Sequence, residues 1–172
     1  KKIIKKIIKP TLEAIKDIGQ KYNGFLYAGL MIKNDEPYLI EYNVRMGDPE
    51  CQTILPLLKT DLLDLIVACC NQKLDEQNID WYEKKSLSIV LCSKGYPESY
   101  KKNIEIPNLY NFKLDKNSFI YHAGTKMLDD TVNAIGGRVL NFVSISEDYL
   151  EARNKAINHI KKLNWKNGFY RK

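Results

Sequence analysis

A charged segment that is poor in aliphatic side chains, residues 75–85, divides the sequence into two parts with different hydrophobic patterns. Before this segment, apolar residues recur mainly at helical spacing, around one pair of strand-like runs. After it, strand-like runs predominate until a final amphipathic stretch. We therefore predict an α+β fold with two domains, residues 1–80 and residues 81–172.

The length and composition fit an ordinary globular chain. With 172 residues, of which 44% are hydrophobic, the chain is long enough to bury roughly 70% of its unfolded surface. No apolar run approaches the ~20 residues needed to cross a bilayer, and the N-terminus lacks a signal-peptide pattern. We therefore expect a soluble cytoplasmic protein with no membrane partner.

The cysteine pattern agrees with a reducing compartment. The four cysteines form no CxxC pair, which argues against a zinc site. The adjacent pair Cys69 and Cys70 lies in an apolar run and is predicted to supply small core side chains.

A net charge of +6, from 27 Lys and Arg against 21 Asp and Glu, permits nucleic-acid binding without requiring it. Only Arg45, Arg138, Arg153 and Arg171 are arginines, and the basic N-terminal run contains neither Arg nor aromatic residues. Proteins that bind RNA or DNA usually interleave such residues with lysines. We predict no nucleic-acid partner, and keep a basic binding module with the Ile/Lys helix as its contact surface as the non-enzyme alternative.

Residues 1–80 are predicted to contain helices around one antiparallel hairpin. The elements are a kinked or two-part helix from Lys1 to near Gly19 with Pro10 in a first turn, strands at 25–31 and 38–40, and helices at 50–58 and 61–71. Residues 81–172 are predicted to contain strands at 86–92, 119–123 and 139–146, and a last helix at 147–163. For that helix we predict Ser146 as the cap, a structural or surface role for His159, and an apolar face of Tyr149, Ala152, Ala156, Ile160 and Leu163.

The strongest candidate site lies at residues 41–45. Strand alternation would send Glu41, Asn43 and Arg45 to one face. Two hard oxygen ligands suit Mg²⁺, which fills its shell with water and substrate phosphates, and an arginine beyond them can hold an anion. This is the logic of phosphoryl transfer, although an exposed Glu–Arg pair would give the same pattern.

The continuation, Arg45-Met46-Gly47-Asp48-Pro49-Glu50-Cys51-Gln52, resembles the RFGDPE signature of the phosphoribosylamine–glycine ligase family, with Met46 in place of the usual Phe. Further segments resemble other landmarks of that family in the same order along the chain. They are residues 22–32, 122–126, 136–140 and 168–172.

The resemblance implies an ATP-grasp ligase of purine biosynthesis. ATP would phosphorylate glycine, and the amine of 5-phosphoribosylamine would attack the glycyl phosphate to give glycinamide ribonucleotide, ADP and phosphate. By position, Glu41 and Asn43 would bind Mg²⁺ or Mn²⁺ and link it to ATP, and Arg45 would steady the transferring phosphoryl group. Asp48 would act as a second catalytic residue that orients a substrate amine.

Further substrate-binding positions are also implied. Glu50 would orient a substrate amine, or serve as the first-turn acid of a helix. Gly47 and Pro49 would shape the exit from strand to helix. Lys126 and Arg138 would reach substrate phosphate, or be plain surface cations.

The resemblance covers roughly the C-terminal two-fifths of such a ligase, namely the end of the ATP-grasp domain and the small mixed α/β C-terminal domain. We therefore expect the chain to be a fragment that needs the N-terminal part of the same ligase as its partner. The enzyme alternatives are another ATP-grasp carboxylate–amine ligase and a biotin-dependent carboxylase, which share the Glu-x-Asn-x-Arg strand.

Overall fold

The computed structural model describes residues 1–171 and consists of two compact units. The first unit contains Lys1–Asp48 and Leu58–Asp80, and the second contains Pro49–Leu57 and Trp81–Lys172. The break after Asp80 coincides with the domain boundary drawn from sequence, whereas Pro49–Leu57 groups with the second unit. The division into domains 1–80 and 81–172 stays a prediction. Lys172, the last residue of the second predicted domain, lies outside the described residues.

The first unit begins with a two-part helix, as predicted. A π-helix, η1 (Ile4–Ile8), leads into α1 (Lys9–Asp17), with Pro10 in the first turn of α1. Proline has no backbone N–H to donate to the turn that precedes it. The change from π-helix to α-helix occurs one residue before Pro10.

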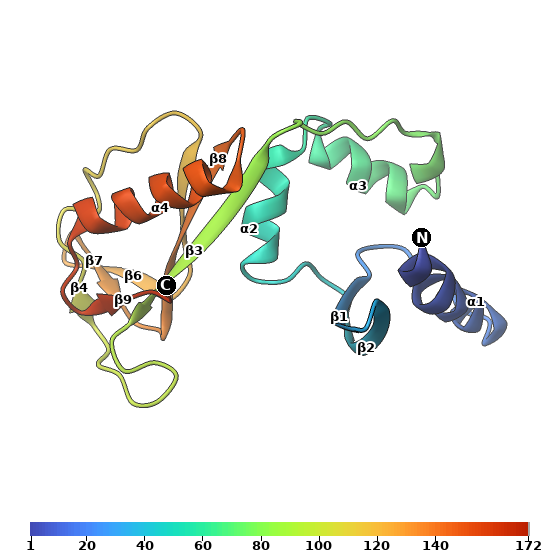
Figure 1. Ribbon diagram of the computed structural model, residues 1–172, viewed down its shortest axis with the longest axis horizontal. Helices are drawn as coiled ribbons and strands as arrows, with labels where there is room; N and C mark the ends of the chain where they lie inside the picture. Colours follow the sequence, from blue (N-terminus) through green and yellow to red (C-terminus); the bar gives the residue numbers. More distant parts are fainter. Residues whose placement is uncertain (172) are drawn as a thin grey trace. The chain divides into compact units, whose positions relative to one another are not determined.

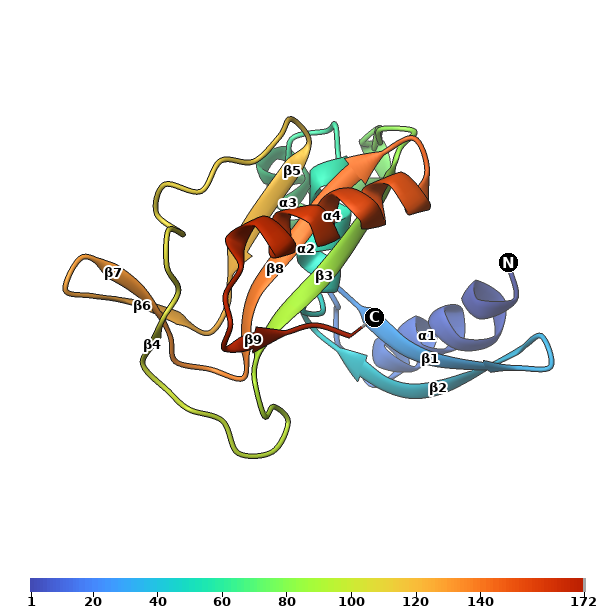
Figure 2. The same ribbon diagram turned by 60° about the vertical axis from the view of Figure 1, so that its left-hand side comes forward.

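An antiparallel hairpin follows, which confirms the hairpin predicted from the two strand-like runs of this part of the chain. Strands β1 (Tyr27–Lys33) and β2 (Glu36–Asn43) pair along their whole length. The two turn residues, Asn34 and Asp35, both have left-handed φ angles, of 51° and 58°, as expected for the tight turn that matches the twist of a hairpin. Helix α1 lies beside the hairpin (Figures 1 and 2), where Thr11 Oγ1 is 2.7 Å from the hydroxyl of Tyr42.

The helix predicted at 61–71 is α3 (Leu62–Cys70), and a short turn, η3 (Leu74–Glu76), follows it. Asp61 caps α3 by accepting hydrogen bonds from the backbone N–H groups of Leu63 and Asp64. The core role predicted for the cysteine pair is wrong for Cys70, which is exposed, while Cys69 is half-buried. Only Ala68 is buried among the α3 residues, so this helix has a narrow core face.

The helix predicted at 50–58 is shorter than expected. It consists of α2 (Glu50–Ile54) and a 3₁₀ turn, η2 (Leu55–Leu57). Pro56 has no N–H to continue the α-helical hydrogen bonds, which explains the early end of α2.

The second unit is built on a four-stranded antiparallel sheet with the strand order β5-β8-β3-β9. Its strands are β3 (Lys85–Ser93), β5 (Ser118–His122), β8 (Arg138–Ser146) and β9 (Gly168–Phe169). The three longer strands agree with the prediction. Helix α4 (Tyr149–Leu163) covers one face of this sheet, as Figure 2 shows, and packs its buried side chains against Leu140 and Phe142 of β8.

A second, three-stranded sheet was not predicted. It has the order β4-β7-β6, with β4 (Ile104–Glu105), β6 (Thr125–Leu128) and β7 (Thr131–Ala134). The turn between β6 and β7 is Asp129-Asp130, with φ angles of 44° and 61°. Without a glycine at either position, this turn gives no strong signal in the sequence.

Backbone contacts between glycines join the two sheets of the second unit. Gly124 donates to the carbonyl of Arg138 at 2.9 Å and accepts from the N–H of Ile135 at 2.8 Å. A Cβ at Gly124 would lie 2.6 Å from the carbonyl oxygen of Arg138 and 2.7 Å from Cα of Gly136. The family-like segments at 122–126 and 136–140 therefore meet, and glycine is required for this close approach.

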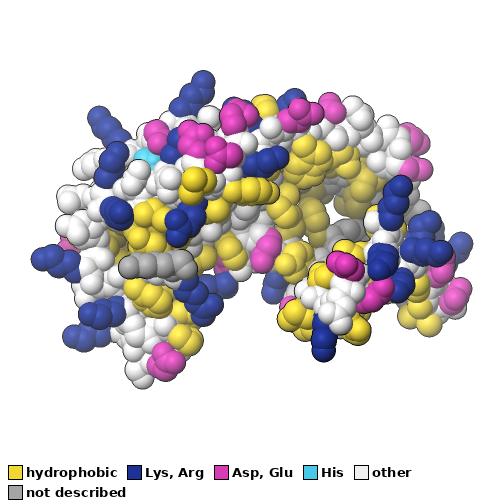
Figure 3. All heavy atoms as spheres, viewed as in Figure 1, with side chains coloured by type: hydrophobic (Ala, Val, Ile, Leu, Met, Phe, Trp, Pro, Cys, Tyr) yellow, Lys and Arg dark blue, Asp and Glu magenta, His cyan; other side chains and the backbone are white. Residues whose placement is uncertain are grey.

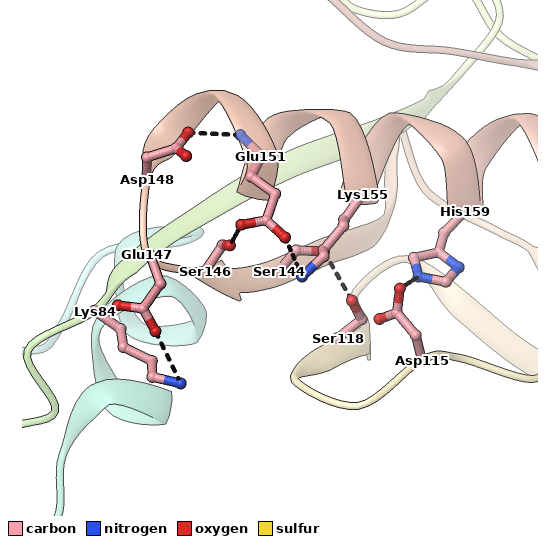
Figure 4. Close-up of polar contacts among 10 residues, drawn as sticks. All are labelled: Lys84, Asp115, Ser118, Ser144, Ser146, Glu147, Asp148, Glu151, Lys155 and His159. Atoms are coloured by element: carbon pink, nitrogen blue, oxygen red, sulfur yellow. Dashed lines mark hydrogen bonds and ion pairs between the residues drawn. The ribbon is translucent and has the colours of Figure 1, made fainter.

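The start of α4 differs from the prediction in two respects. The cap is Asp148, whose carboxylate accepts from the N–H of Glu151 at 2.8 Å, and not Ser146, which belongs to β8 and donates to the Glu151 carboxylate (Figure 4). Tyr149 is 61% exposed and does not belong to the apolar face. The remaining predicted face residues are buried: Ala152, Ala156, Ile160 and Leu163.

His159 has a structural role in α4. It is 3% exposed, and its Nε2 lies 3.2 Å from Oδ2 of Asp115, in the loop before β5 (Figure 4). Although burial opposes ionisation of Asp115, hydrogen bonds from Ser118 and His159 keep the pKa of this carboxyl below its ordinary value of 3.8. The pair joins the loop before β5 to the helix.

Within residues 1–171, no helix is both long and apolar enough to span a bilayer.

We expect Asp115→Asn to lower the free energy of unfolding by about 1 kcal/mol at about pH 6, because the buried His159 loses its acidic partner. The pKa of Asp115 is lower in the folded state than in the unfolded state. Its carboxylate therefore contributes fully to the free energy of unfolding at pH values above the pKa of the unfolded state, and this contribution is lost as the pH falls through the pKa of the folded state. Urea unfolding across this range measures the difference. Asp129→Asn, in the β6–β7 turn, is the matched control, and an equal loss for both variants would contradict the role of the pair.

A second prediction concerns Glu36 at the start of β2. Lys2 and Lys6 lie 2.6 Å and 2.5 Å from its two carboxylate oxygens, and their hydrogen bonds lower the pKa of Glu36 to about 2. The contact between η1 and the hairpin should therefore persist above pH 4.5 and weaken as the pH falls toward about 2. NMR titration of the Glu36 carboxyl measures this, and Lys2→Ala should raise the midpoint while Lys5→Ala should not.

Candidate functional site

The predicted metal ligands lie together at the end of strand β2. Asn43 Nδ2 donates a hydrogen bond to Oε1 of Glu41 at 2.9 Å, so the two side chains share one side of the strand, as alternation requires. Glu41 is exposed and Asn43 is half-buried. The site therefore presents a carboxylate and a carboxamide to solvent.

Gly29 makes room for Glu41 on the neighbouring strand. The two residues are direct partners in the β1–β2 register, next to an irregularity between Gly29 and Leu30. A Cβ at Gly29 would lie 3.1 Å from Cγ of Glu41, closer than an ordinary contact. Gly29 is thus a positioning residue that the sequence analysis did not single out, and a glycine paired with the acidic residue of a hairpin is the signal that could have found it.

Arg45 lies beyond the strand. Because β2 ends at Asn43, the alternation of a strand does not extend to Arg45, whose guanidinium Nη1 donates to the carbonyl of Met46 at 3.1 Å. Val44 is 73% exposed. The guanidinium therefore lies close to the turn that follows the strand, three residues before Asp48.

The remaining signature residues lead from β2 into α2. Gly47 is buried and Asp48 is exposed; Pro49 stands at the N-cap position of α2, and Glu50 is the acid in its first turn. Residues up to Asp48 belong to the first unit, whereas Pro49 and Glu50 belong to the second. The first-turn position is favourable for Glu50 whether or not it also binds a substrate.

The two predicted phosphate-binding cations lie in different parts of the second unit. Lys126 is exposed on β6, opposite Asn133 of β7. Arg138 begins β8, is paired with Cys92 of β3 and lines a cavity of about 570 Å³ that Lys126 does not line.

Glu41 and Asn43 fit a hard divalent cation by their chemistry. Both offer oxygen donors, the kind that Mg²⁺ and Mn²⁺ prefer, and a half-turn of the Asn43 amide would direct its oxygen rather than its nitrogen toward Glu41. Within residues 1–171 there is no cluster of three or more His, Cys, Asp or Glu side chains suited to a metal.

Comparison with known families gives two matches in chain order. Residues 1–51 match the family described as phosphoribosylglycinamide synthetase, ATP-grasp (A) domain, and residues 86–172 match phosphoribosylglycinamide synthetase, C domain.

Individual relatives agree with the family matches. The chain is 44% identical over 170 residues to phosphoribosylamine–glycine ligase of Caldanaerobacter subterraneus, covering 99% of this chain and 40% of that protein. It is 41% identical to the trifunctional purine biosynthetic protein adenosine-3 of Gallus gallus, and the match covers 99% of this chain and 17% of that protein. The crystal structure of phosphoribosylamine–glycine ligase from Thermotoga maritima superposes with a TM-score of 0.82 at 31% identity. The superposition covers 98% of this chain and 41% of that one. The chain thus spans about two-fifths of the length of the single-function relatives that it matches.

We expect Mn²⁺ to broaden the amide NMR signals of residues 41–43 selectively, because Glu41 and Asn43 offer the oxygen pair described above. Glu41→Gln should abolish this selectivity, and Glu13→Gln, on exposed α1, should leave it unchanged. Gly29→Ala should weaken it, because the new Cβ displaces the Glu41 side chain by a few tenths of an ångström. Equal broadening in wild type and Glu41→Gln would rule out the site.

Proposed function

Because the chain belongs to the phosphoribosylamine–glycine ligase family, we propose that it supplies the metal-binding strand and the C domain of an ATP-dependent ligase. The enzyme joins glycine to 5-phosphoribosylamine through glycyl phosphate and releases glycinamide ribonucleotide, ADP and phosphate. The observation that carries the proposal is the contact between Glu41 and Asn43, just before the segment that resembles the family signature.

In this proposal Glu41 and Asn43 hold Mg²⁺ or Mn²⁺, which offsets the negative charge of the ATP phosphates when bound. Gly29 keeps the Glu41 carboxylate in place from the adjacent strand. Arg45 has a planar guanidinium that can grip two phosphoryl oxygens at once, which a lysine cannot do. Its part is to stabilise the phosphoryl group as it passes from ATP to the glycine carboxylate.

Asp48 is proposed to hold a substrate amine. Its carboxylate is exposed two residues before α2, and a carboxylate can accept hydrogen bonds from an ammonium or amine. Glu50 is the second candidate for this task. Gly47 and Pro49 shape the backbone between strand and helix, and Lys126 and Arg138 contribute positive charge for substrate phosphate.

The exposed apolar surface of the first unit supports a larger assembly. Side chains on both faces of the β1–β2 hairpin reach the surface, including Met31 and Ile32 on β1 and Ile40 on β2, and Figure 3 shows hydrophobic side chains there. A two-stranded hairpin is only marginally stable unless other elements cover it, and apolar patches mark contact surfaces. We assign this cover to the N-terminal part of the same ligase, in keeping with the greater length of its relatives.

The cytoplasm is the proposed location. The cysteines are free thiols, namely Cys51, Cys69, Cys70 and Cys92, and free thiols persist in a reducing compartment.

The test is an assay of the longest open reading frame that encodes this chain, for ADP formation that requires both glycine and 5-phosphoribosylamine. We expect turnover in this protein, none in the 172-residue chain alone, and a loss of at least a hundredfold in kcat/KM for Glu41→Ala, because the metal and phosphates lose their anchor. Glu13→Ala is the matched control. ADP formation that needs no glycine, or that survives Glu41→Ala, would refute the proposal.

A further inference from the structure

Two of the four arginines in the chain line one cavity of the second unit. The cavity measures about 570 Å³, and its wall includes Arg138, Arg171, Cys92, Tyr96 and Phe169. In a sequence whose cations are mostly lysines, this is a local concentration of the side chain best suited to planar, two-pronged anion binding.

The sheet register explains why these side chains meet. Cys92 in β3 is the direct partner of Arg138 in β8 on one side and of Phe169 in β9 on the other. Directly opposed residues of antiparallel strands place their side chains on the same face. Arg171 lies two residues beyond the end of β9 and lines the same cavity as Phe169, while the intervening Tyr170 packs against the core.

A β-bulge turns Arg138 toward this face. The β3–β8 register shifts between Leu91 and Cys92, so that Leu91 pairs with Leu140 but Cys92 pairs with Arg138. Strict alternation along β8 would place Arg138 on the same face as Leu140, the face covered by α4, but Val139 is an extra residue without a partner in β3, so Arg138 pairs with Cys92 instead. The bulge redirects the arginine to the opposite face, a use of bulges that recurs beside binding sites.

Electrostatics agrees with this geometry. Burial raises the pKa of the Cys92 thiol, and the charges of Arg138 and Arg171 act in the opposite direction. Both guanidinium groups therefore lie close enough to Cys92 to influence one buried atom, and both favour negative charge on this side of the sheet.

Tyr96 forms a wall of the cavity beside the arginines. A Cβ at Gly137, immediately before Arg138, would overlap the Tyr96 ring, so the ring lies directly on the backbone of this glycine. Its hydroxyl is a further hydrogen-bonding group. Phe169 and Val90 add apolar surface, so the cavity combines a cationic end with a wall suited to a small organic body.

We propose that the cavity between Arg138, Arg171 and Tyr96 binds the phosphate monoester of a ribose 5-phosphate unit, which is the phosphoribosyl end of the amine substrate. The identity of this substrate rests on the proposed function, whereas the phosphate site rests on the cavity itself. The two guanidinium groups, with five N–H donors each, surround the phosphate oxygens and can keep other partners at the same time. Arg171 and Tyr96 are thereby assigned to binding together with Arg138.

The test is an NMR titration of the 172-residue chain with ribose 5-phosphate, ribose, inorganic phosphate and ATP. We expect ribose 5-phosphate to shift the signals of residues 92, 96, 138 and 169–171, and to bind at least tenfold more tightly than ribose or inorganic phosphate. Arg138→Gln and Arg171→Gln should each weaken binding about tenfold or more. Arg153→Gln, at an exposed position of α4, is the matched control, and well-dispersed spectra verify that each variant is folded.

The outcomes separate this site from the ligase reaction. Equal affinity for inorganic phosphate, stronger binding of ATP, or affinity unaffected by both arginine substitutions would overturn the assignment. If ribose 5-phosphate binds as expected but the longer protein forms no glycine-dependent ADP, the site stands and the proposed function fails. In an active enzyme, Arg171→Gln should raise the KM for 5-phosphoribosylamine about tenfold and leave the KM for ATP unchanged, and the reverse pattern would also overturn the assignment.

Discussion

The pairing of β8 with β3 is the interaction on which the second unit depends. Strand β8 is buried from Val139 to Ser146, pairs with β3 on one edge and β5 on the other, and carries Leu140 and Phe142 into the core beneath α4. Because both edges and both faces of this strand are covered, its register determines where every attached element lies. The glycine contacts at Gly124 and Gly136 then join the smaller sheet to the same strand.

The first unit has no equivalent centre. Among the buried hydrophobic side chains of the described residues, only Ala68 belongs to it. Its order comes from the hairpin pairing, the caps of its helices and polar contacts such as those of Glu36 with two lysines. Polar contacts of this kind are individually weak in water, so the first unit gains little stability from a core of its own. Glu41 and Asn43 therefore lie in the unit with the smaller buried core.

Much of the fold could be predicted from local patterns. The two-part N-terminal helix, the hairpin, α3 and the three long strands carry clear periodicity or turn residues, so their sequences suffice. The β6–β7 hairpin was missed because its Asp129-Asp130 turn lacks glycine. The cap of α4 was misplaced because two further residues, Glu147 and Asp148, separate the end of β8 from the start of the helix.

The site was predictable in part for similar reasons. Spacing alone placed Glu41 and Asn43 on one side of a strand, and their hydrogen bond agrees. Alternation does not determine the side of Arg45, because the strand ends two residues earlier, so the placement of Arg45 with this pair stays a prediction. Gly29 could have been found only from the register of the hairpin, which pairs it with Glu41. Arg171 could not be found from spacing, because it comes near Cys92 only through the pairing of β9 with the distant β3.

The bulge at Val139 has a further consequence for how this surface can change. Loss of Val139 would join Arg138 directly to Leu140, and regular alternation would still direct the arginine to the face opposite Leu140, in register with Cys92. The arginine would therefore stay in the cavity although the strand had become one residue shorter. In related chains, the residue that pairs with the equivalent of Cys92, and not the residue at a fixed distance from Leu140, is the one that faces this surface.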